Sequence, residues 1–472
     1  MRDLVFVAFL AAIFGMGLKR PFILVLAYVY IDIVSPQRLT YVLLNAVPIS
    51  LVAVALAVGG WLLMDDKSDS RFAPRQGLIV ALLLYCWATT AGADFPLDAK
   101  DKWDWVWKCL AFAAFLPLTL RTRLRIEALL LFMILSAASI IIVGGIKTAA
   151  GGGGYGQLDL MVNNNSGLYE GSTISTVAIA IVPLIVWFMR FGTVFPPDWK
   201  VKGFCLCLIF ACLLIPIGTS TRTGTLCTVL VALLSLRNTK RKLLYLSIIA
   251  AVGLAAIPFL PASFTDRMST IKKHDADESA STRLAVWQWT IDYAKTHPFG
   301  GGFEAYRGNH IRYEIKKTAP ADGGAASAAA PVTDQAVTDK ARGYHSAYFE
   351  MLGEQGYLGL ALWLSISLIG LFRMEVLRRR YRDPAGPFAW AGPLAAALQT
   401  AHLVYLLGAA AGDRTARAHQ RTGDRRLAGG ALPYSRRDRR LARTRGGAVR
   451  QGLSRGRLLL PAVRLRHLAD LA

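Results

Sequence analysis

Cysteine is scarce in this sequence, and the motifs of several common enzyme classes are missing from it. Its six cysteines lie in or beside apolar runs, and no two of them have Cys-x-x-Cys spacing. Such cysteines are typical of small buried apolar side chains rather than of a disulfide framework or a metal site. Residues 151–154 are a glycine run that lacks the following Lys-Ser/Thr of a phosphate-binding loop. We therefore expect neither a metal nor a cofactor.

Long polar stretches are also few, and apolar runs dominate the chain. Hydrophobic residues make up 54% of the sequence. Runs of about 15–22 residues recur between short charged loops, as in polytopic helical membrane proteins. We predict an all-α fold, a transmembrane helical bundle of about 11–12 spans. The predicted spans are residues 4–18, 22–34, 42–64, 78–91, 106–120, 126–143, 174–188, 204–217, 224–236, 243–260, 346–372 and 389–411.

The two ends of the chain need separate interpretation. The run 4–18 is followed by Lys19-Arg20-Pro21 and more apolar sequence rather than by a small-residue cleavage site, so we interpret it as a retained helix. Residues 411–472 hold 16 Arg and 4 acidic residues, so 16 − 4 = 12 of the net charge of +23 lies there. This uneven distribution argues against a nucleic-acid-binding surface. We interpret the tail as a disordered or frame-shifted extension, not a native domain.

Basic residues gather in every second loop, and the positive-inside rule makes those loops cytoplasmic. The alternate loops, at residues 147–171, 218–223 and 261–343, are then extracytoplasmic. We divide the chain into a transmembrane region (1–260), an extracytoplasmic catalytic loop (261–345), C-terminal transmembrane helices (346–410) and the tail. The basic loops contain Lys67, Arg71, Arg75, Arg121, Arg123, Arg125, Arg190, Lys200, Lys202, Arg237, Lys240, Arg241, Lys242, Arg373, Arg378, Arg379, Arg380 and Arg382.

The long loop shows one helical pattern and one low-complexity stretch. Residues 283–296 have apolar side chains at spacings of three and four, which predicts an amphipathic helix with Ser281 as its N-cap. The glycines at 300–302 predict a flexible turn. Residues 318–340 are rich in Ala, Gly and Thr, and we expect a disordered insert there.

Two arginines on the outer side are candidate anion-binding residues. Arg222 lies in a polar turn between two spans, where Ser220 and Thr221 add hydroxyl donors. A guanidinium fits phosphate oxygens bidentately and is costly at a membrane edge without an anion. Arg283 opens the amphipathic helix, whose N-terminus also attracts anions. The alternatives are that Arg222 reaches lipid headgroups and that Arg283 is an ordinary exposed side chain.

His345 stands where the long loop returns to an apolar run. A neutral imidazole can take a hydroxyl proton near neutral pH and so act as a general base. Glu350 or Glu354 could orient the ring; the alternative is that His345 caps an interfacial helix. Asn163 and Asn164 could bind a glycan or cap the helix that follows them.

These motifs, taken in order, resemble the O-antigen ligase superfamily. The matching pieces are Ser-Thr-Arg-x-Gly at 220–224, the loop with Arg283 and Pro-Phe-Gly-Gly-Gly at 298–302, and His-Ser-x-Tyr-x-Glu at 345–350. The superfamily includes O-antigen polymerases and bacterial protein O-oligosaccharyltransferases. Lys-Arg-Pro at 19–21 and Asn163-Asn164 are further similar to O-glycosylation ligases found beside exosortase systems. The resemblance covers about residues 1–405, and the Ala-rich insert and the lost final span depart from it.

The resemblance implies a glycosyltransferase of the bacterial cytoplasmic membrane, with its loop in the periplasm. It would move a glycan from a polyprenyl diphosphate carrier to an acceptor hydroxyl by inverting, metal-independent transfer. Arg222 and Arg283 would bind the diphosphate and His345 would act as base. Ser220, Thr221, Asn163, Asn164 and Glu350 would contact the donor. The alternatives are a polymerase with the same donor or a polysaccharide transporter, and the acceptor is a lipid, a protein or a glycan.

Overall fold

The computed structural model describes residues 2–40, 42–44, 47–68, 70–151, 167–256, 258, 260, 264–265, 278–318 and 332–410. The predicted all-α fold is confirmed, with one β-hairpin added. The helices are α1 (Arg2–Lys19), α2 (Phe22–Val34), α3 (Pro36–Leu39), α4 (Ile49–Met64), α5 (Pro74–Ala91), α6 (Pro96–Thr119), α7 (Arg123–Gly151), α8 (Gly171–Phe191), α9 (Trp199–Gly218), α10 (Arg222–Ser235), α11 (Lys242–Ala256), α13 (Glu278–Thr296), α14 (Ala347–Arg380) and α15 (Ala391–Ala409), and the strands are β1 (His310–Thr318) and β2 (Val332–Lys340).

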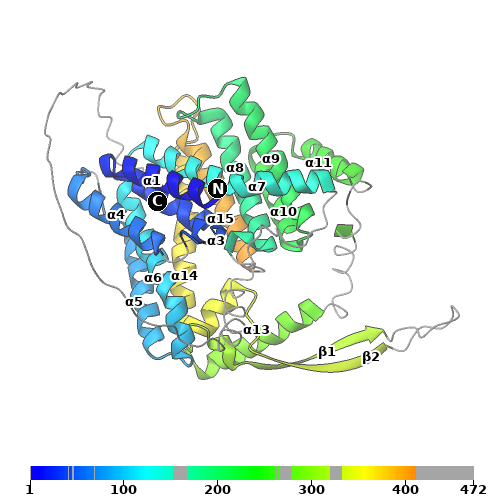
Figure 1. The fold of residues 1–472 in the computed structure, drawn as a ribbon. Coiled ribbons are helices and arrows are strands. Elements are labelled where there is room, and N and C mark those ends of the chain that lie inside the picture. Colours follow the sequence, from blue (N-terminus) through cyan, green and yellow to red (C-terminus); the bar gives the residue numbers. More distant parts are fainter. Residues whose placement is uncertain are drawn as a thin grey trace.

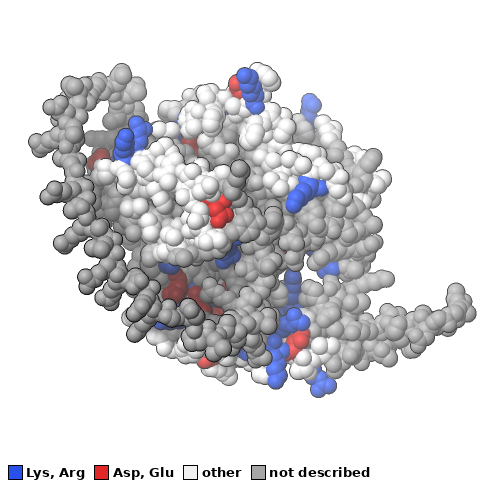
Figure 2. All heavy atoms as spheres, in the orientation of Figure 1, with Lys and Arg blue, Asp and Glu red and all other residues white. Residues whose placement is uncertain are grey.

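The apolar runs of the sequence become helices, and several of these have membrane-spanning length. Within the described residues, α7, α8, α9 and α14 are each long and apolar enough to cross a bilayer, and α2, α4, α10 and α11 are shorter apolar helices. On α9 the side chains of Leu206, Phe210 and Leu213 stay exposed on one face, at the spacing of a single helical stripe. In Figure 2 much of the described surface is uncharged, with Lys and Arg in separated groups. Such a surface suits a lipid environment.

Polar groups and small residues determine how these helices begin and how closely they pack. The Glu170 carboxylate accepts hydrogen bonds from the Ser172 and Thr173 amides and so caps α8. A Cβ on Gly145 of α7 would lie 2.9 Å from the Cβ of Ala211 on α9, so the glycine permits that close approach. In Figure 1, α5 and α6 lie on one side of the molecule and α8–α11 on the other, with α14 and α15 between them.

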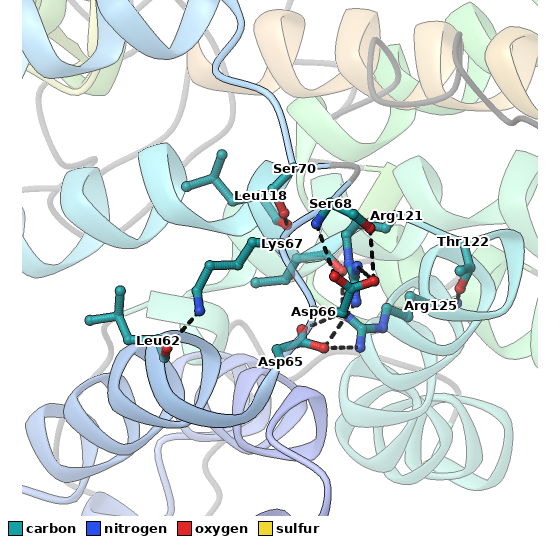
Figure 3. Close-up of polar contacts among 11 residues, drawn as sticks. Leu62, Asp65, Asp66, Lys67, Ser68, Ser70, Leu118, Arg121, Thr122 and Arg125 are labelled. Carbon is teal, nitrogen blue, oxygen red and sulfur yellow. Dashed lines mark hydrogen bonds and ion pairs between the residues drawn. The ribbon is translucent and has the colours of Figure 1, made fainter.

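Charged residues tie three of the basic loops together at one end of the bundle. Asp65, which follows α4, accepts hydrogen bonds from Arg121 Nη2 at 3.0 Å and Arg125 Nη1 at 2.7 Å (Figure 3). The buried Glu127 accepts from Arg123 Nε at 2.5 Å and from the amide of Thr193 at 2.8 Å. The loops after α4, α6 and α8 therefore meet at this end, which we call the basic end.

Part of the expected disordered insert is ordered, so that prediction is wrong for residues 332–340. They form β2, which pairs antiparallel with β1 from His310↔Lys340 to Thr318↔Val332. At the base, Asn309 donates from Nδ2 to the carbonyl of Arg342 and accepts the Arg342 amide on Oδ1. The composition of the insert hid a run with the Thr and Val content of a strand. Residues 319–331 lie outside the described residues, as does the tail.

The predicted helix is confirmed, but it starts earlier than predicted, and Leu284 and Ile291 of its expected apolar face are exposed. α13 already includes Glu278, so Ser281 is not the N-cap, and Arg283 does not lie in the first turn. The N-terminus of α13 therefore does not reinforce Arg283 as an anion site. α13 packs against the rest of the protein through the side that carries Trp287.

Candidate active site

α14 is broken near its start. Gly356 has φ 62° and ψ −166°, which separates a short helix at 347–355, called here the half-helix, from the apolar helix at 357–380. A Cβ at position 356 would lie 2.2 Å from the carbonyl oxygen of Pro298. Both the positive φ and the close approach require glycine. The break leaves carbonyl groups at the end of the half-helix without helical partners.

The glycine turn at 300–302 satisfies those carbonyl groups. The amide of Gly301 donates to the carbonyl of Gly353 at 3.1 Å, and the amide of Gly302 donates to the carbonyl of Glu354 at 2.9 Å. A side chain on Gly300 would meet the Glu354 carbonyl at 2.4 Å. The turn that we predicted as flexible is therefore hydrogen-bonded against the half-helix.

The corner between α5 and α6 holds the other side of this turn. The Asp94 amide donates to the Gly301 carbonyl at 2.9 Å, and the Tyr85 hydroxyl donates to the Phe299 carbonyl at 3.0 Å. The Tyr293 hydroxyl of α13 donates to the Asp94 carboxylate. Burial, and then this carboxylate, raise the pKa of Tyr293 well above its usual value, so the phenol stays protonated as a donor. The corner thereby joins both the turn and α13.

A buried charge cluster joins α6 to the half-helix. Lys102 Nζ lies 2.5 Å from Glu350 Oε1 and 2.7 Å from Glu354 Oε1. The amide of Glu304 also donates to Glu354 Oε1, at 2.9 Å. Burial acts to lower the pKa of Lys102, but Glu350 and Glu354 outweigh it and hold that pKa above its usual value. Lys102 is therefore a charged ammonium, and it is the partner of both carboxylates that we had considered for orienting His345.

His345 adopts a strained backbone conformation directly before the half-helix. Its φ is 51°, and Ser346, not His345, occupies the N-cap position of α14. Ser220 (φ 51°) and Glu304 (φ 65°) share this left-handed region. Non-glycine residues adopt it at a cost and gather at functional sites. Ser35 and Ala341, outside the candidate segments, also adopt it, so this strain occurs at His345 and Ser220 without being confined to them.

α13 brings Arg283 toward the start of the half-helix. Trp287, one helical turn after Arg283, donates from Nε1 to the carbonyl of Tyr344 at 2.9 Å. Its ring stacks on Phe349 with centroids 4.8 Å apart. Since Tyr344 directly precedes His345, the segments that carry Arg283 and His345 are in contact.

The Arg222 turn reaches the half-helix through α15. The Thr221 hydroxyl donates to the Ser175 hydroxyl of α8 at 2.9 Å. The neighbouring Thr176 packs on Gly408, where a Cβ would lie 2.3 Å from its Cγ2. The Tyr348 hydroxyl of the half-helix donates to the carbonyl of Leu406 at 3.1 Å. The end of α15 therefore bridges the two segments, and all three candidate segments lie at the same end of the bundle.

This end is opposite the basic end. α8 begins at Gly171 near Thr221 and ends at Phe191, whose carbonyl accepts a hydrogen bond from Arg123 Nη2 at 2.5 Å. Arg222 is the first residue of α10, where a cation gains no stabilisation from the helix dipole unless an anion is present. Within the described part of the chain there is no group of three His, Cys, Asp or Glu side chains that could hold a metal. Asn163 and Asn164 lie outside the described residues.

Lys102 was not predicted, although the sequence carries a signal for it. We began the span at residue 106 and treated the preceding residues as loop, whereas α6 begins at Pro96. Ala99 and Val106 lie one turn on either side of Lys102, and both pack in an apolar cluster with Trp103. A lysine at helical spacing between such residues indicates a buried cation that needs an acidic partner.

Helices of membrane-spanning length, with a polar site at the end opposite the basic loops, define a multi-pass membrane protein. Residues 205–364 match the family model described as O-Antigen ligase, and residues 1–193 match a family of unknown function (DUF5935). Residues 205–364 thus form an O-antigen ligase domain, which confirms the resemblance to that superfamily, whereas the further similarity to ligases found beside exosortase systems stays a prediction. Arg222, Arg283, His345 and Glu350 fall within the ligase match, and Lys102 falls within the other. No curated protein matches the sequence.

Proposed function

We propose that this protein transfers a glycan from a polyprenyl diphosphate carrier to an acceptor hydroxyl by an inverting, metal-independent reaction. A glycan transfer of the ligase or polymerase type follows from the ligase domain. The more specific reaction rests on one observation. The segments carrying Arg222, Arg283 and His345 meet at one end of the bundle through Trp287, Tyr348 and the end of α15.

The three residues share two tasks in this reaction, proton abstraction and binding of the diphosphate. The acceptor oxygen attacks the anomeric carbon from the face opposite the diphosphate, and the bond from that carbon to the diphosphate oxygen breaks. His345 takes the acceptor proton, a contribution of about 10²–10⁴ in rate for a general base. Arg222 and Arg283 bind the departing diphosphate, and preorganised donors of this kind contribute about 3 kcal/mol each.

The hydroxyl of Ser220 is a further donor for the diphosphate or its sugar. The Thr221 hydroxyl donates to Ser175 in this structure, so it would have to release that bond to donate to the substrate. Glu350 has a partner that the sequence did not suggest. Its Oε1 is 2.5 Å from Lys102 Nζ, so the carboxylate supports the half-helix, and its contact with the glycan stays a prediction. Asn163 and Asn164 remain candidates for glycan binding on sequence grounds.

The side of the membrane follows from charge. Positive loops favour the cytoplasm, and Arg121, Arg123 and Arg125 lie at the basic end. We therefore assign the site to the outer face of the bacterial cytoplasmic membrane. Lipid-linked glycan and an acceptor with a free hydroxyl would meet there.

The test is glycan transfer in isolated membranes that contain lipid-linked donor and acceptor. We expect His345→Ala, Arg222→Ala and Arg283→Ala each to lower the initial rate by about 10²-fold or more. His310→Ala and Arg312→Ala are matched controls, because both side chains are exposed on the same loop; we expect them to keep the parental rate. Transfer at the parental rate by His345→Ala would refute the assignment of the base.

A further inference from the structure

The charge cluster around Lys102 joins the two matched regions of the chain. Lys102 comes from residues 1–193, whereas Glu304, Glu350 and Glu354 come from the ligase domain. The side chains of Lys102, Glu350 and Glu354 are only 10%, 11% and 2% exposed. The network extends through Arg307, which binds Glu304 at 3.3 Å and Asp98 of α6 at 3.2 Å.

The half-helix depends on contacts from outside itself. It spans only residues 347–355, because Gly356 ends it. Helices of fewer than about 12 residues are marginal in water without tertiary contacts. Two of its side chains, Glu350 and Glu354, are buried carboxylates, and burying a carboxylate is costly unless a cation pairs with it. Lys102 supplies that cation to both.

His345 is joined directly to this segment. The amide of Glu350 donates to the carbonyl of Ser346 at 2.9 Å, so the first turn of the half-helix begins at the residue after the histidine. The other end is held by the glycine turn and by the Tyr85 hydroxyl, whose one hydrogen is shared between the carbonyls of Phe299 at 3.0 Å and Gln355 at 3.1 Å. A shift of Glu350 and Glu354 away from α6 would therefore carry His345 with it.

We propose that Lys102 is a positioning residue that holds the half-helix, and with it His345, in the geometry needed for proton abstraction. This gives residues 1–193 a role in the site: they supply the cation, and the α5–α6 corner, against which the catalytic segment of the ligase domain is ordered. The catalytic part of the inference rests on the proposed function, whereas its structural part does not.

Two readouts on the full-length protein in native membranes test this. The first is the initial rate of glycan transfer by Lys102→Met, by the control Lys100→Met, and by the triple variant Lys102→Met/Glu350→Gln/Glu354→Gln. Lys100 is exposed on the same helix, so its loss leaves the cluster intact. The triple variant removes the cation together with the two carboxylates that need it.

The second readout does not depend on catalysis. Ala347→Cys, at a position that is 3% exposed in the first turn of the half-helix, is placed in a variant whose six native cysteines are replaced by alanine, and its labelling by a membrane-impermeant maleimide is timed. Local opening exposes a buried segment to reagents in proportion to the open population. We expect Lys102→Met to raise the labelling rate by about tenfold or more, Lys100→Met to leave it unchanged, and the triple variant to return it close to the parental rate.

The outcomes separate the two claims. Slower transfer and faster labelling in Lys102→Met, both reversed in the triple variant, support the positioning role. Parental labelling in Lys102→Met overturns it, whatever happens to the transfer rate. If Lys102→Met fails to accumulate in the membrane, the triple variant decides: restored accumulation with parental labelling supports the proposal, and continued loss overturns it. Should the labelling pattern hold while His345→Ala still transfers glycan at the parental rate, the structural part of the inference stands and the assignment of His345 as the base fails.

Discussion

Tyr85 and Gln355 are joined by a hydrogen bond of 3.1 Å, from the tyrosine hydroxyl to the glutamine carbonyl, across 270 positions of the chain. A second bond links the same two elements, from the Thr89 hydroxyl to the Gln355 side-chain oxygen at 2.6 Å. α5 thus holds the point at which α14 breaks. The region that matches a family of unknown function therefore contributes contacts to the candidate site and is not only a membrane anchor.

The break in α14 gives a direct test of the site architecture. Gly356→Ala places a side chain at positive φ and against the Pro298 carbonyl, which costs about 1–3 kcal/mol. We expect a lower midpoint of thermal unfolding in detergent, followed by tryptophan fluorescence, and a reduced transfer rate. Gly203→Ala on α9 has open space around its Cβ and is the control. Equal midpoints for the two variants would contradict the strained turn.

The basic end gives a prediction about stability alone. Glu127 is fully buried and accepts hydrogen bonds from Arg123 and Thr193. Glu127→Ala removes the partner of a cation that is itself 30% exposed, so solvent reduces the loss to about 2 kcal/mol. The unfolding midpoint should fall while the Michaelis constant for the donor stays the same. Asp104→Asn, at an exposed site on α6, should change neither quantity.

The β-hairpin depends on one asparagine at its base. Asn309 is fully buried and binds the Arg342 backbone through both side-chain atoms. Asn309→Ala leaves those backbone groups without their partner, at a cost of about 1–3 kcal/mol. We expect faster cleavage between residues 310 and 340 in limited proteolysis. The exposed Gln288→Ala is the control, and cleavage at the same rate in both variants would show that the base does not depend on Asn309.

Arg222 allows the geometry of anion binding to be separated from its charge. Arg222→Lys keeps the positive charge but loses the planar pair of donors that matches two phosphate oxygens. We expect its Michaelis constant for the lipid-linked donor to rise by roughly tenfold, with a deeper loss of transfer in Arg222→Ala. If lysine restores the parental constant, the site recognises charge alone.

The helices could be predicted from the sequence because apolar runs bounded by charge are a local property. Glu350 and Glu354 of α14 could be placed near the membrane edge from the sequence, but their partner could not. Lys102 is 248 positions from Glu350, and pairing over such a separation depends on tertiary packing. The glycine turn shows the same limit. Its glycine content predicted a flexible backbone. The hydrogen bonds that hold it come from the half-helix on one side and from the α5–α6 corner on the other.

The hairpin and the start of α13 were missed for a different reason. A short strand gains its stability from a partner strand, so β2 was hidden within a stretch whose composition alone suggested disorder. The start of α13 was placed by a single capping residue, Ser281, although the helix already includes Glu278. The order of Arg222, Arg283 and His345 along the chain was visible from the sequence, while their contacts through Trp287 and Tyr348 were not.

The interruption at Gly356 has a mechanical consequence. A continuous helix would transmit a change in bilayer thickness or tilt straight from the apolar helix at 357–380 to the histidine. Here the last carbonyls of the half-helix bind the glycine turn instead, so the hydrogen bonding along α14 is interrupted at that point. A tilt of the long part would then reach the candidate base only through side-chain packing, in which Met351, Leu362 and Trp363 share one apolar cluster with α5.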